Sequence, residues 1–515
     1  MLAKLFSAAV NGLQATIVEI EIGTYPGLDL HLSGLPDSAI RESISRVKTA
    51  IANTGYKKLY QAIVLNLAPA NLRKEGTGYD LPIAIAMLTC ADVVSRDQLS
   101  KTILLGELGL DGTLRPIKGC LPVAIEARKQ GFENLIVPME NVREAAVVNR
   151  IKVFGANHLE EVVDFLNGRE SLNQTIIDTR KEFFNCQNQF DCDFSEVRGQ
   201  ENVKRAFEVA AAGGHNMIMI GSPGCGKSMM AKRMPTILPP LSLAESVETT
   251  QIHSVAGILS PDTSLITQRP FRSPHHTISD VALIGGGSTF QPGEISLAHH
   301  GILFLDELPE FNRTAIETLR QPLEDRRITI NRAKYRIDLP CSFQLIAAMN
   351  PCPCGFYNDP HHHCECNPGQ VKRYLNKISG PLLDRIDIQV EVVPLTFDEI
   401  SRTSPGESSM TIRERVMAAR AIQTERFKEY PNIHCNAQMS SKLLHNLVQP
   451  DEAGLQLLKS AMDRFNMSAR AYEKILKVAR TIADLAGSEN IQFNHLAEAI
   501  GYRNLDRGDW AERSV

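Results

Sequence analysis

The segment that most limits how this chain can fold is GSPGCGKS, which follows the apolar run Met217–Ile220. It matches GxxxxGK[ST], a phosphate loop between a buried strand and a helix. Its glycines let backbone N–H groups turn toward phosphate oxygens, while the helix presents its positive end. The lysine is expected to reach the β- and γ-phosphates of ATP and the serine to hold Mg²⁺. The candidate nucleotide-binding residues here are Gly221, Ser222, Pro223, Gly224, Cys225, Gly226, Lys227 and Ser228.

Two later strand-like runs end in polar residues that suit the same chemistry. ILFLDEL ends in Asp306 and Glu307, and SFQLIAAMN ends in Asn350. We expect Asp306 to order Mg²⁺ and its water, Glu307 to act as general base, and Asn350 to orient the attacking water. An acidic pair alone is usual at a solvated strand end, and a buried turn-forming asparagine is the alternative at Asn350. Beside a phosphate loop, the pattern favours ATP hydrolysis.

A chain of 515 residues is longer than one hydrophobic core usually supports, and its hydrophobic pattern divides it into several domains. Residues 1–168 alternate strand and helix patterns, and 169–194 are polar and weakly periodic, as in a linker. Residues 195–395 carry apolar strands between helical stretches, which predicts a parallel sheet wrapped by helices. Residues 396–515 show helical periodicity with few strand signals. The expected class is α/β, with a helical lid domain at the end.

Charge and cysteine usage bound the setting of the chain. With 55 Lys plus Arg against 59 Asp plus Glu, the formal charge is -4, so any nucleic-acid contact must come from a local basic patch. No apolar run reaches the roughly 18 to 20 residues of a membrane span. The start imitates a signal peptide only faintly, because Asn11 interrupts it. Eleven unevenly spread cysteines fit a reducing compartment, so a cytoplasmic location without membrane contact is expected.

CPCGFYNDPHHHCEC places Cys352, Cys354, Cys364 and Cys366 as two CxC pairs separated by nine residues. Four thiolates can close a tetrahedral Zn²⁺ site, and four protein ligands make such a site structural. The spacing CxC is less common for zinc than CxxC, so loop cysteines without a ligand are the alternative. His275, His276, His299 and His300 are interpreted as loop or core histidines.

With these motifs in place, the central and C-terminal parts resemble AAA+ ATPases of the magnesium-chelatase-like branch. VRGQENVKRAFEVAAAGGHN is similar to the adenine-side segment of that family, which implies Val197, Gln200 and His215 as base-pocket residues. In GPLLDRIDIQVEV, Arg385 matches the arginine finger that reaches the γ-phosphate of a neighbouring subunit, which implies a ring. In NMSARAYEKILKVARTIADL, Arg470 resembles the second sensor arginine.

The arginine on this last helix leaves alternatives open. Arg480 lies on the same segment and is the second candidate for the sensor, and either residue could instead be a surface arginine.

Longer phrases extend the resemblance to the whole chain. YPGLDLHLSGLPDSAIRESISRVKTAI, NLAPANLRKEGTGYDLPIAIAML, PFRSPHHTISDVALIGGG and PGEISLAHHGILFLDELPEF are similar to the ComM family of bacterial competence proteins. Members of that family are associated with natural transformation as hexameric helicases that branch-migrate DNA. The resemblance therefore implies a hexameric ring acting on single-stranded or branched DNA. The alternatives are a magnesium-chelatase motor subunit, an ATP-dependent protease or chaperone, and a scaffold that binds ATP without hydrolysis.

Two insertions offer a place for DNA. IGGGSTFQPGEISLAHHG is a glycine-rich stretch of the kind that protrudes into a ring's pore, and ITINRAKYRIDL predicts a hairpin with Arg332 and Lys334 near its tip. Basic side chains on a pore hairpin can grip phosphates without reading bases. A solvated hairpin tip is the alternative.

The N-terminal domain resembles the proteolytic domain of Lon proteases, which use a serine–lysine dyad. RKEGTGYDLPIA has Gly78 at the expected serine, and RPIKGCLPVA has Leu121 near the expected lysine. Acyl transfer therefore has neither its nucleophile nor its base at these positions.

Overall fold

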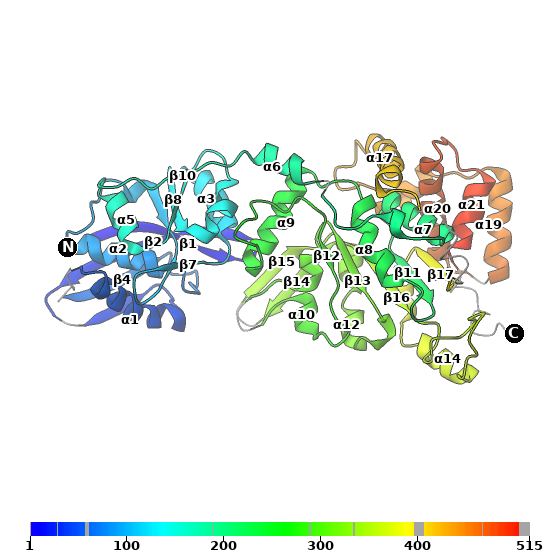
Figure 1. The fold of residues 1–515 in the computed structure, drawn as a ribbon, viewed down its shortest axis with the longest axis horizontal. Coiled ribbons are helices and arrows are strands. Elements are labelled where there is room, and N and C mark those ends of the chain that lie inside the picture. The colour runs from blue at the N-terminus through cyan, green and yellow to red at the C-terminus, as the bar shows by residue number, and fades with distance from the viewer. Residues whose placement is uncertain are drawn as a thin grey trace. The chain divides into compact units, whose positions relative to one another are not determined.

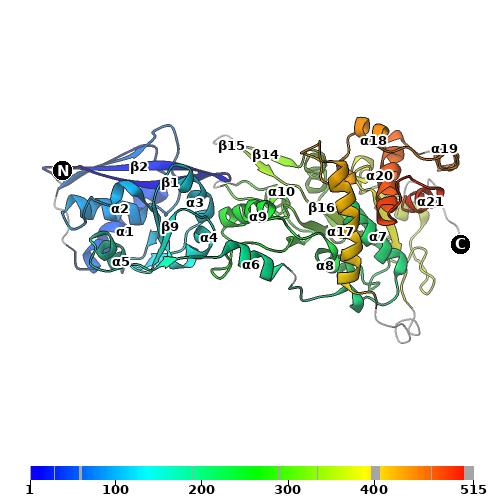
Figure 2. The same cartoon turned by 90° about the horizontal axis from the view of Figure 1, so that it is seen from above.

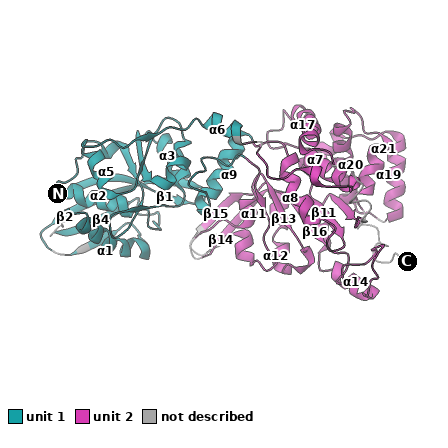
Figure 3. Cartoon of the chain, viewed as in Figure 1, with its two compact units in different colours: residues 1–186, 242–267 teal, residues 187–241, 268–515 magenta. Residues whose placement is uncertain are grey.

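The computed structural model describes residues 2–27, 29–56, 61–187, 189–287, 290–332, 335–395, 406–465 and 467–503. Figure 1 shows the order of the elements along the chain. Contacts divide it into two compact units, residues 1–186 with 242–267 and residues 187–241 with 268–515 (Figure 3). Both units combine sheets with helices, so the predicted α/β class is confirmed. Within the described ranges, none of the helices is long and apolar enough to cross a membrane.

Unit 1 is built on a mixed eight-stranded sheet in the order β10-β9-β8-β5-β1-β2-β4-β3. Its strands are β1 (Leu2–Asn11), β2 (Gln14–Tyr25), β3 (Leu30–Ser33), β4 (Ala62–Ala68), β5 (Thr102–Leu104), β8 (Asn134–Pro138), β9 (Lys152–Ala156) and β10 (Gln174–Thr175), with a small hairpin of β6 (Glu107–Leu108) and β7 (Leu114–Arg115). Its helices are α1 (Ser38–Asn53), α2 (Asp80–Cys90), α3 (Cys120–Lys129), α4 (Val142–Ala146), α5 (Leu159–Leu166), α6 (Thr179–Cys186) and α9 (Leu243–Ala256). All eleven residues of α2 are buried, which explains why nine of them are apolar and only Asp80 and Thr89 are polar.

Two segments belong elsewhere than the sequence suggested. The stretch expected to be a linker contains β10 and α6, and both belong to unit 1. Residues 242–267, expected in the central domain, also belong to unit 1, where α9 packs against α3. Helix α9 begins at a capping box formed by Ser242 and Glu245 and ends at Gly257 in the left-handed conformation. Such local signals mark where a helix starts and stops, but not which sheet it joins.

Unit 2 contains a five-stranded sheet in the order β12-β13-β16-β11-β17, with every neighbouring pair parallel. The strands are β12 (Phe271–Arg272), β13 (Ile302–Leu305), β16 (Gln344–Met349), β11 (Met217–Gly221) and β17 (Ile388–Val392). Every residue of β11, β13 and β16 is buried, as expected for parallel strands covered on both faces. Their carboxyl ends meet at one edge of the sheet.

Helices surround this sheet and form the C-terminal region. They are α7 (Glu201–Gly213), α8 (Lys227–Ile237), α10 (Asp280–Ile284), α11 (Glu294–Leu297), α12 (Arg313–Glu317), α13 (Arg320–Asp325), α14 (Pro368–Leu375), α15 (Gly380–Leu383), α17 (Ser409–Arg426), α18 (Ser441–Leu447), α19 (Glu452–Phe465), α20 (Ala469–Leu485) and α21 (Phe493–Gly501). A separate hairpin pairs β14 (Arg327–Arg332) with β15 (Tyr335–Pro340).

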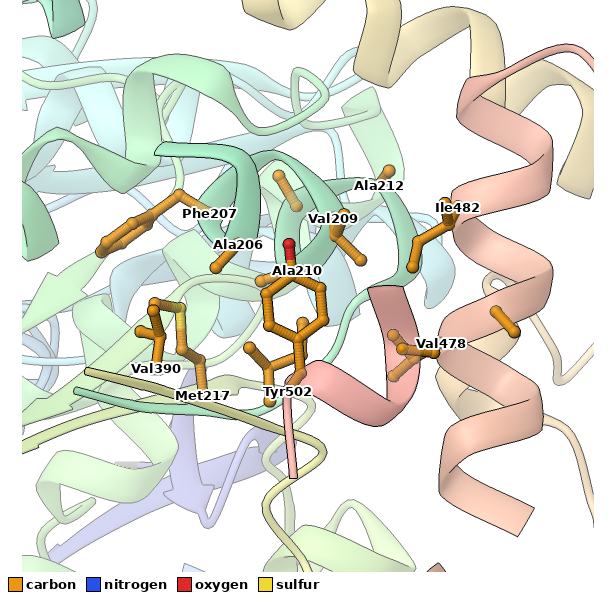
Figure 4. Close-up of a cluster of buried hydrophobic side chains, with 14 of the residues drawn as sticks. Ala206, Phe207, Val209, Ala210, Ala212, Met217, Val390, Val478, Ile482 and Tyr502 are labelled. Carbon is orange, nitrogen blue, oxygen red and sulfur yellow. The ribbon is translucent and has the colours of Figure 1, made fainter. Parts of the chain in front are cut away.

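One continuous core joins the sheet to the C-terminal helices. Helix α7 lies between the sheet and α20, with Met217 and Val390 below it and Val478 and Ile482 beside it (Figure 4). A run of alanines on α7 lets these layers approach closely. Helix α17 packs against both α7 and α8, as the view from above also shows (Figure 2). The C-terminal helices and the sheet therefore share one hydrophobic core.

Candidate active site

The loop between β11 and α8 has the backbone that a phosphate loop requires. Gly224 (φ 81°) and Gly226 (φ 89°) lie in the left-handed region, which favours glycine. At Gly221 an added Cβ would lie 2.3 Å from the carbonyl oxygen of Val392, so only glycine fits there. Lys227 begins α8, which places free backbone N–H groups of the helix at the loop.

The lysine of the loop connects two of the predicted motifs. Lys227 is 8% exposed, and its Nζ donates to the carbonyl oxygens of Gly221 at 2.6 Å and Ser222 at 2.9 Å. It also donates to Oδ1 of Asn350 at 3.3 Å. Asn350 follows β16, the strand next to β11, so the parallel sheet brings these two side chains together.

The serine of the loop meets the first carboxylate of the acidic pair. Oγ of Ser228 donates to Oδ2 of Asp306 at 2.5 Å. A hydroxyl beside a carboxylate is the oxygen donor set that holds Mg²⁺ in phosphate-loop ATPases, so these residues fit the ion. A cavity of about 380 Å³ unites the site and is lined by Pro223, Gly224, Gly226, Lys227, Ser228, Met229, Asp306, Glu307 and Asn350.

Glu307 stands in an unusual backbone conformation, with φ 51° and ψ 44°. A non-glycine residue in the left-handed region carries strain, which often accompanies functional sites. Its side chain is 55% exposed, and Oε2 lies 3.2 Å from Nδ1 of His276. The sequence analysis interpreted His276 as a loop or core histidine. The sequence clue to its role was that His276 follows closely after Phe271–Arg272, the strand that pairs with β13.

Asp359 is a second residue that the sequence analysis did not single out. Its carboxylate is 1% exposed, and Oδ2 accepts a hydrogen bond from Oγ of Ser222 in the phosphate loop. Oδ1 accepts from the backbone N–H groups of His361 at 2.8 Å and His362 at 2.9 Å. Burial opposes ionisation, but these hydrogen bonds outweigh it and lower the pKa of Asp359 to about 2. Its place within the cysteine motif was the only clue in the sequence.

The four cysteines of the CxC pairs come together in space. Sγ of Cys352 lies 3.2 Å from that of Cys354 and 3.7 Å from that of Cys364, and the last two lie 3.6 Å apart. With Cys366, all four sulfur atoms lie within 4.8 Å of one another. Zn–S bonds of about 2.3 Å in a tetrahedron place sulfur atoms about 3.8 Å apart, so the thiols fit one Zn²⁺ ion.

Two thiols of this cluster, Cys354 and Cys364, differ in acidity. Burial raises the pKa of the Cys354 thiol, but hydrogen bonds from the backbone N–H of Phe356 and from neighbouring groups outweigh it and lower that pKa to about 6. Burial raises the pKa of Cys364 to about 12. The thiolate is therefore favoured at Cys354 and disfavoured at Cys364, whereas a bound Zn²⁺ ion would require all four thiols to lose their protons.

The two predicted arginines lie away from this cavity. Arg385 precedes β17 and is therefore at the amino edge of the sheet, where Nε donates to the carbonyl of Arg320 at 3.0 Å. Its guanidinium also pairs with Glu324 at 2.5 Å. Arg470 is 67% exposed at the start of α20 and lies 3.4 Å from Asp384. Asp384 is the residue before Arg385, so Arg470 also lies near the amino edge. Among the described residues, neither arginine contacts the phosphate loop of its own chain.

Arg480, the second candidate for the sensor, has a structural place. It is 4% exposed and pairs with Asp484, and Arg426 pairs with the same carboxylate at 2.5 Å. Its remaining N–H groups donate to the carbonyls of Ser488 and Glu489. Its guanidinium is fully engaged within the helical region.

The expected base-pocket residues do not share one surface. Val197 is 1% exposed in the main core, and Gln200 begins α7 in the left-handed conformation, with Nε2 donating to the carbonyl of Val393 at 2.5 Å. His215 is completely buried between Asp387 at 3.1 Å and the hydroxyl of Thr481 at 2.8 Å. Both ring nitrogens of His215 therefore contact protein groups, which leaves no polar edge for a base.

His215 belongs instead to a buried charge network that joins the sheet to α20. Burial lowers the pKa of His215, which favours the neutral ring. Burial opposes ionisation of Asp387, but Lys474 at 2.9 Å and His215 outweigh it and hold the pKa of Asp387 well below its usual range.

The two insertions lie next to each other. At Gly285 an added Cβ would be 3.1 Å from Cδ1 of Ile330 in the hairpin, and Gly285, Gly286 and Gly287 all have positive φ. The hairpin pairs from Arg327↔Pro340 to Arg332↔Tyr335, as the sequence suggested. Arg332 is the last residue of β14, whereas its side chain and Lys334 lie outside the described residues.

The expected catalytic positions of the N-terminal domain are apolar. An added Cβ at Gly78 would face Ile117 and Leu105, each 3.8 to 3.9 Å away. Leu121 is completely buried in α3. These surroundings suit packing rather than acyl transfer.

A parallel sheet in this order, with a phosphate loop after its central strand, an acidic pair after another strand and packed C-terminal helices, defines an AAA+ ATPase. Family models agree over most of the chain. Residues 193–400 match magnesium chelatase, subunit ChlI, residues 18–141 match subunit ChlI of Mg-chelatase, and residues 406–503 match the ChlI C-terminal region.

Relatives identify the branch. The chain is 41% identical over 510 residues to competence protein ComM of Haemophilus influenzae, covering 98% of each protein. It is 41% identical over 508 residues to the YifB protein of Escherichia coli, again covering 98% of each. The magnesium-chelatase 38 kDa subunit of Cereibacter sphaeroides is 22% identical over 252 residues, 44% of this chain and 72% of that subunit. The chain belongs to the ComM family of magnesium-chelatase-type AAA+ ATPases.

Proposed function

We propose that the chain is an ATP-driven ring motor that moves DNA, acting as a hexameric helicase that promotes branch migration during natural transformation. The observation that carries this proposal is the contact between the glycine-rich loop and the basic hairpin, on the unit that holds the phosphate loop. The name of the Haemophilus influenzae relative supports the link to competence.

The chemistry at the cavity is phosphoryl transfer to water. Mg²⁺, held by Ser228 and Asp306, supplies positive charge that neutralises the phosphate oxygens when ATP is bound. Lys227 supports the terminal phosphates and Asn350 orients water, while Glu307 accepts its proton. The proposal is supported by the fact that all five side chains line this cavity.

The ring follows from the arginine at the opposite edge of the sheet. Arg385 lies at the amino edge and does not reach the phosphate loop of its own chain. In the proposed ring, the Arg385 of a second subunit therefore contacts the γ-phosphate held beside Lys227. Such a finger stabilises the charge of the transition state. Closed repetition of one heterologous contact gives a cyclic ring, and six subunits is our proposal for its size.

The hairpin has the two faces that a DNA-gripping element needs. Ile328, Ile330, Ile337 and Leu339 are buried on one face. Arg327 and Arg336 are exposed, and Arg332 and Lys334 follow toward the tip. The apolar face anchors the hairpin beside the glycine loop, and the exposed Arg327 and Arg336 are available to phosphates.

We also propose that the four cysteines bind a structural Zn²⁺ ion, because their sulfur spacing fits one tetrahedral ion. The ion would be held by the protein alone, so it takes no direct part in hydrolysis.

The deciding experiment is branch migration of a synthetic DNA junction by the purified protein. Wild type with ATP should move the junction, whereas Glu307→Gln or a non-hydrolysable analogue should bind without moving it. Hydrolysis that responds to porphyrin-loaded partner proteins or to unfolded protein, but not to DNA, would replace this proposal with chelatase or protease-type work.

A further inference from the structure

The segment from Pro351 to Asn367 does two things at once. It gathers the four thiols, and it lies directly against the phosphate loop. It starts immediately after Asn350, whose side chain contacts Lys227, and ends where α14 begins. The metal cluster and the ATP site are therefore joined by short, continuous stretches of chain.

The first contact with the phosphate loop is polar. Asp359 accepts the hydroxyl hydrogen of Ser222 through one carboxylate oxygen and two backbone N–H groups through the other. Because the second oxygen is fixed by His361 and His362, the orientation of Asp359 depends on the conformation of the chain between Cys354 and Cys364. Ser222 in turn lies one residue from Gly221, whose carbonyl binds Lys227.

The second contact is steric. Gly355, with φ 89°, lies so close to Pro223 that an added Cβ would be 2.6 Å from the proline Cδ. Gly355 follows Cys354 directly and donates its backbone N–H to the carbonyl of Cys352 at 3.0 Å. The CxC turn is thus in van der Waals contact with the phosphate loop.

We propose that metal binding by the four cysteines sets the affinity of the phosphate loop for ATP, with Asp359 as the positioning residue that transmits it. This rests on the proposed ATP and zinc sites. With the metal bound, four Sγ bonds fix both ends of the segment, and Asp359 and Gly355 hold Ser222 and Pro223 in place. Without it, thiols at these distances share only weak hydrogen bonds, so the segment gains conformational freedom that ATP binding must remove.

The test compares ATP binding with and without metal, using a fluorescent ATP analogue and zinc content measured on the same samples. Wild type should hold one zinc per chain, lose about tenfold in ATP affinity on chelation, and recover with added Zn²⁺. Asp359→Ala should keep its zinc, lose a similar factor in affinity, and lose little more on chelation. Asp359→Asn can accept both backbone N–H groups on its amide oxygen and donate its amide N–H to the Ser222 hydroxyl, so it should recover most of the affinity.

Glu365→Gln is the matched control, since Glu365 is an exposed carboxylate in the same segment and should behave as wild type. In steady-state hydrolysis measured over a range of ATP concentrations, Asp359→Ala should raise KM while kcat stays close to wild type, because Glu307 and Asn350 are unchanged. A wild type without zinc, an affinity that ignores chelation, or an Asp359→Ala variant with unchanged or tighter binding overturns the proposal. Junction migration is not used as a readout, so failure of the DNA motor would leave this result intact. Loss of ATP binding by Lys227→Ala checks the ATP site separately.

Discussion

The two edges of the unit 2 sheet are built in opposite ways. At the carboxyl edge, side chains from three parallel strands converge on one cavity, where Lys227 contacts Asn350 and Ser228 contacts Asp306. At the amino edge, Arg385 is tied to its own chain by Glu324 and by a backbone carbonyl. One edge gathers the residues of the proposed ATP site, and the other holds the arginine that is the proposed finger.

In the proposed ring, this difference means that each subunit contributes the two edges to two different active sites. A parallel sheet brings residues far apart in sequence to one edge, but it equally separates residues at opposite edges. The proposed ring places the amino edge of one copy against the carboxyl edge of the next. Substitutions at the two edges should be distinguishable by whether their defects can be repaired in mixed assemblies.

The largest effects are expected at the carboxyl edge. Lys227→Ala should abolish ATP binding, because it removes the cation that contacts the terminal phosphates. Glu307→Gln should bind ATP normally and lose roughly 10²- to 10⁴-fold in kcat, because the amide cannot accept a proton from water. ATP titration and steady-state hydrolysis, measured separately on both variants, check this. Near-normal turnover by Glu307→Gln would remove the general-base assignment.

At the amino edge, Arg385→Ala should bind ATP normally and lose about 10²- to 10³-fold in kcat, as when one charge-stabilising donor is removed. Glu324→Gln is the matched control: it releases the ion partner but keeps the arginine, so its turnover should stay near wild type. Mixing Arg385→Ala with Glu307→Gln should restore part of the activity at interfaces where both intact residues meet. Mixed rings without any recovery would count against action across a subunit boundary.

A site residue could be predicted from the sequence only where the residues next to it in the chain determine its position. The phosphate loop, Asp306 and Asn350 were predictable because each follows an apolar strand, and parallel strands end together. The fold class was predictable for the same reason. His215 was not, since its burial between Asp387 and Thr481 depends on helices far along the chain.

Two further residues left only a positional clue in the sequence, and their contacts could not be predicted from it. Asp359 meets Ser222 across 137 positions of the chain, and nothing in either segment marks the other as its partner. His276 meets Glu307 because a two-residue strand, too short to show periodicity, places its segment beside β13. The unit to which α9 belongs was unpredictable for the same reason. Its capping residues are adjacent in sequence and mark its ends, whereas its packing partners in unit 1 are far away in the chain.

A smaller effect is expected when DNA binding is changed and both edges are kept. Arg332→Ala with Lys334→Ala should weaken DNA-stimulated hydrolysis and junction migration and leave basal hydrolysis near wild type. DNA affinity of the double variant should fall less steeply with salt, by up to about two phosphate contacts per subunit, with little change in sequence preference.

Lys428→Ala with Lys459→Ala is a suitable control, because both lysines are exposed on other elements of unit 2. If the hairpin variant migrates junctions at the wild-type rate with an unchanged salt slope, the glycine loop around Gly285 to Gly287 becomes the better candidate for the DNA grip.

The smallest effect concerns His276, which lies beside the general base. Nδ1 of His276 is 3.2 Å from Oε2 of Glu307, and the ring stacks on His275 with centroids 4.1 Å apart. A carboxylate engaged by an imidazole is less available to accept a proton from water, so His276→Ala should raise basal hydrolysis. Both side chains are partly exposed, and contacts of this kind contribute at most about 1 kcal/mol, which limits the increase to about fivefold.

The segment that carries His276 continues into α10 and the glycine loop, and Thr314 on α12 donates to Asp280 of α10 at 3.0 Å. If DNA contacts the glycine loop as proposed, we expect movement of this segment to separate His276 from Glu307. For that reason His276→Ala should also show a smaller stimulation by DNA, because its unstimulated rate is already raised. Steady-state hydrolysis with and without branched DNA measures both effects, and His275→Ala, which leaves the contact with Glu307 in place, is the control. A fall in basal kcat for His276→Ala would instead mean that the histidine holds Glu307 in its working position.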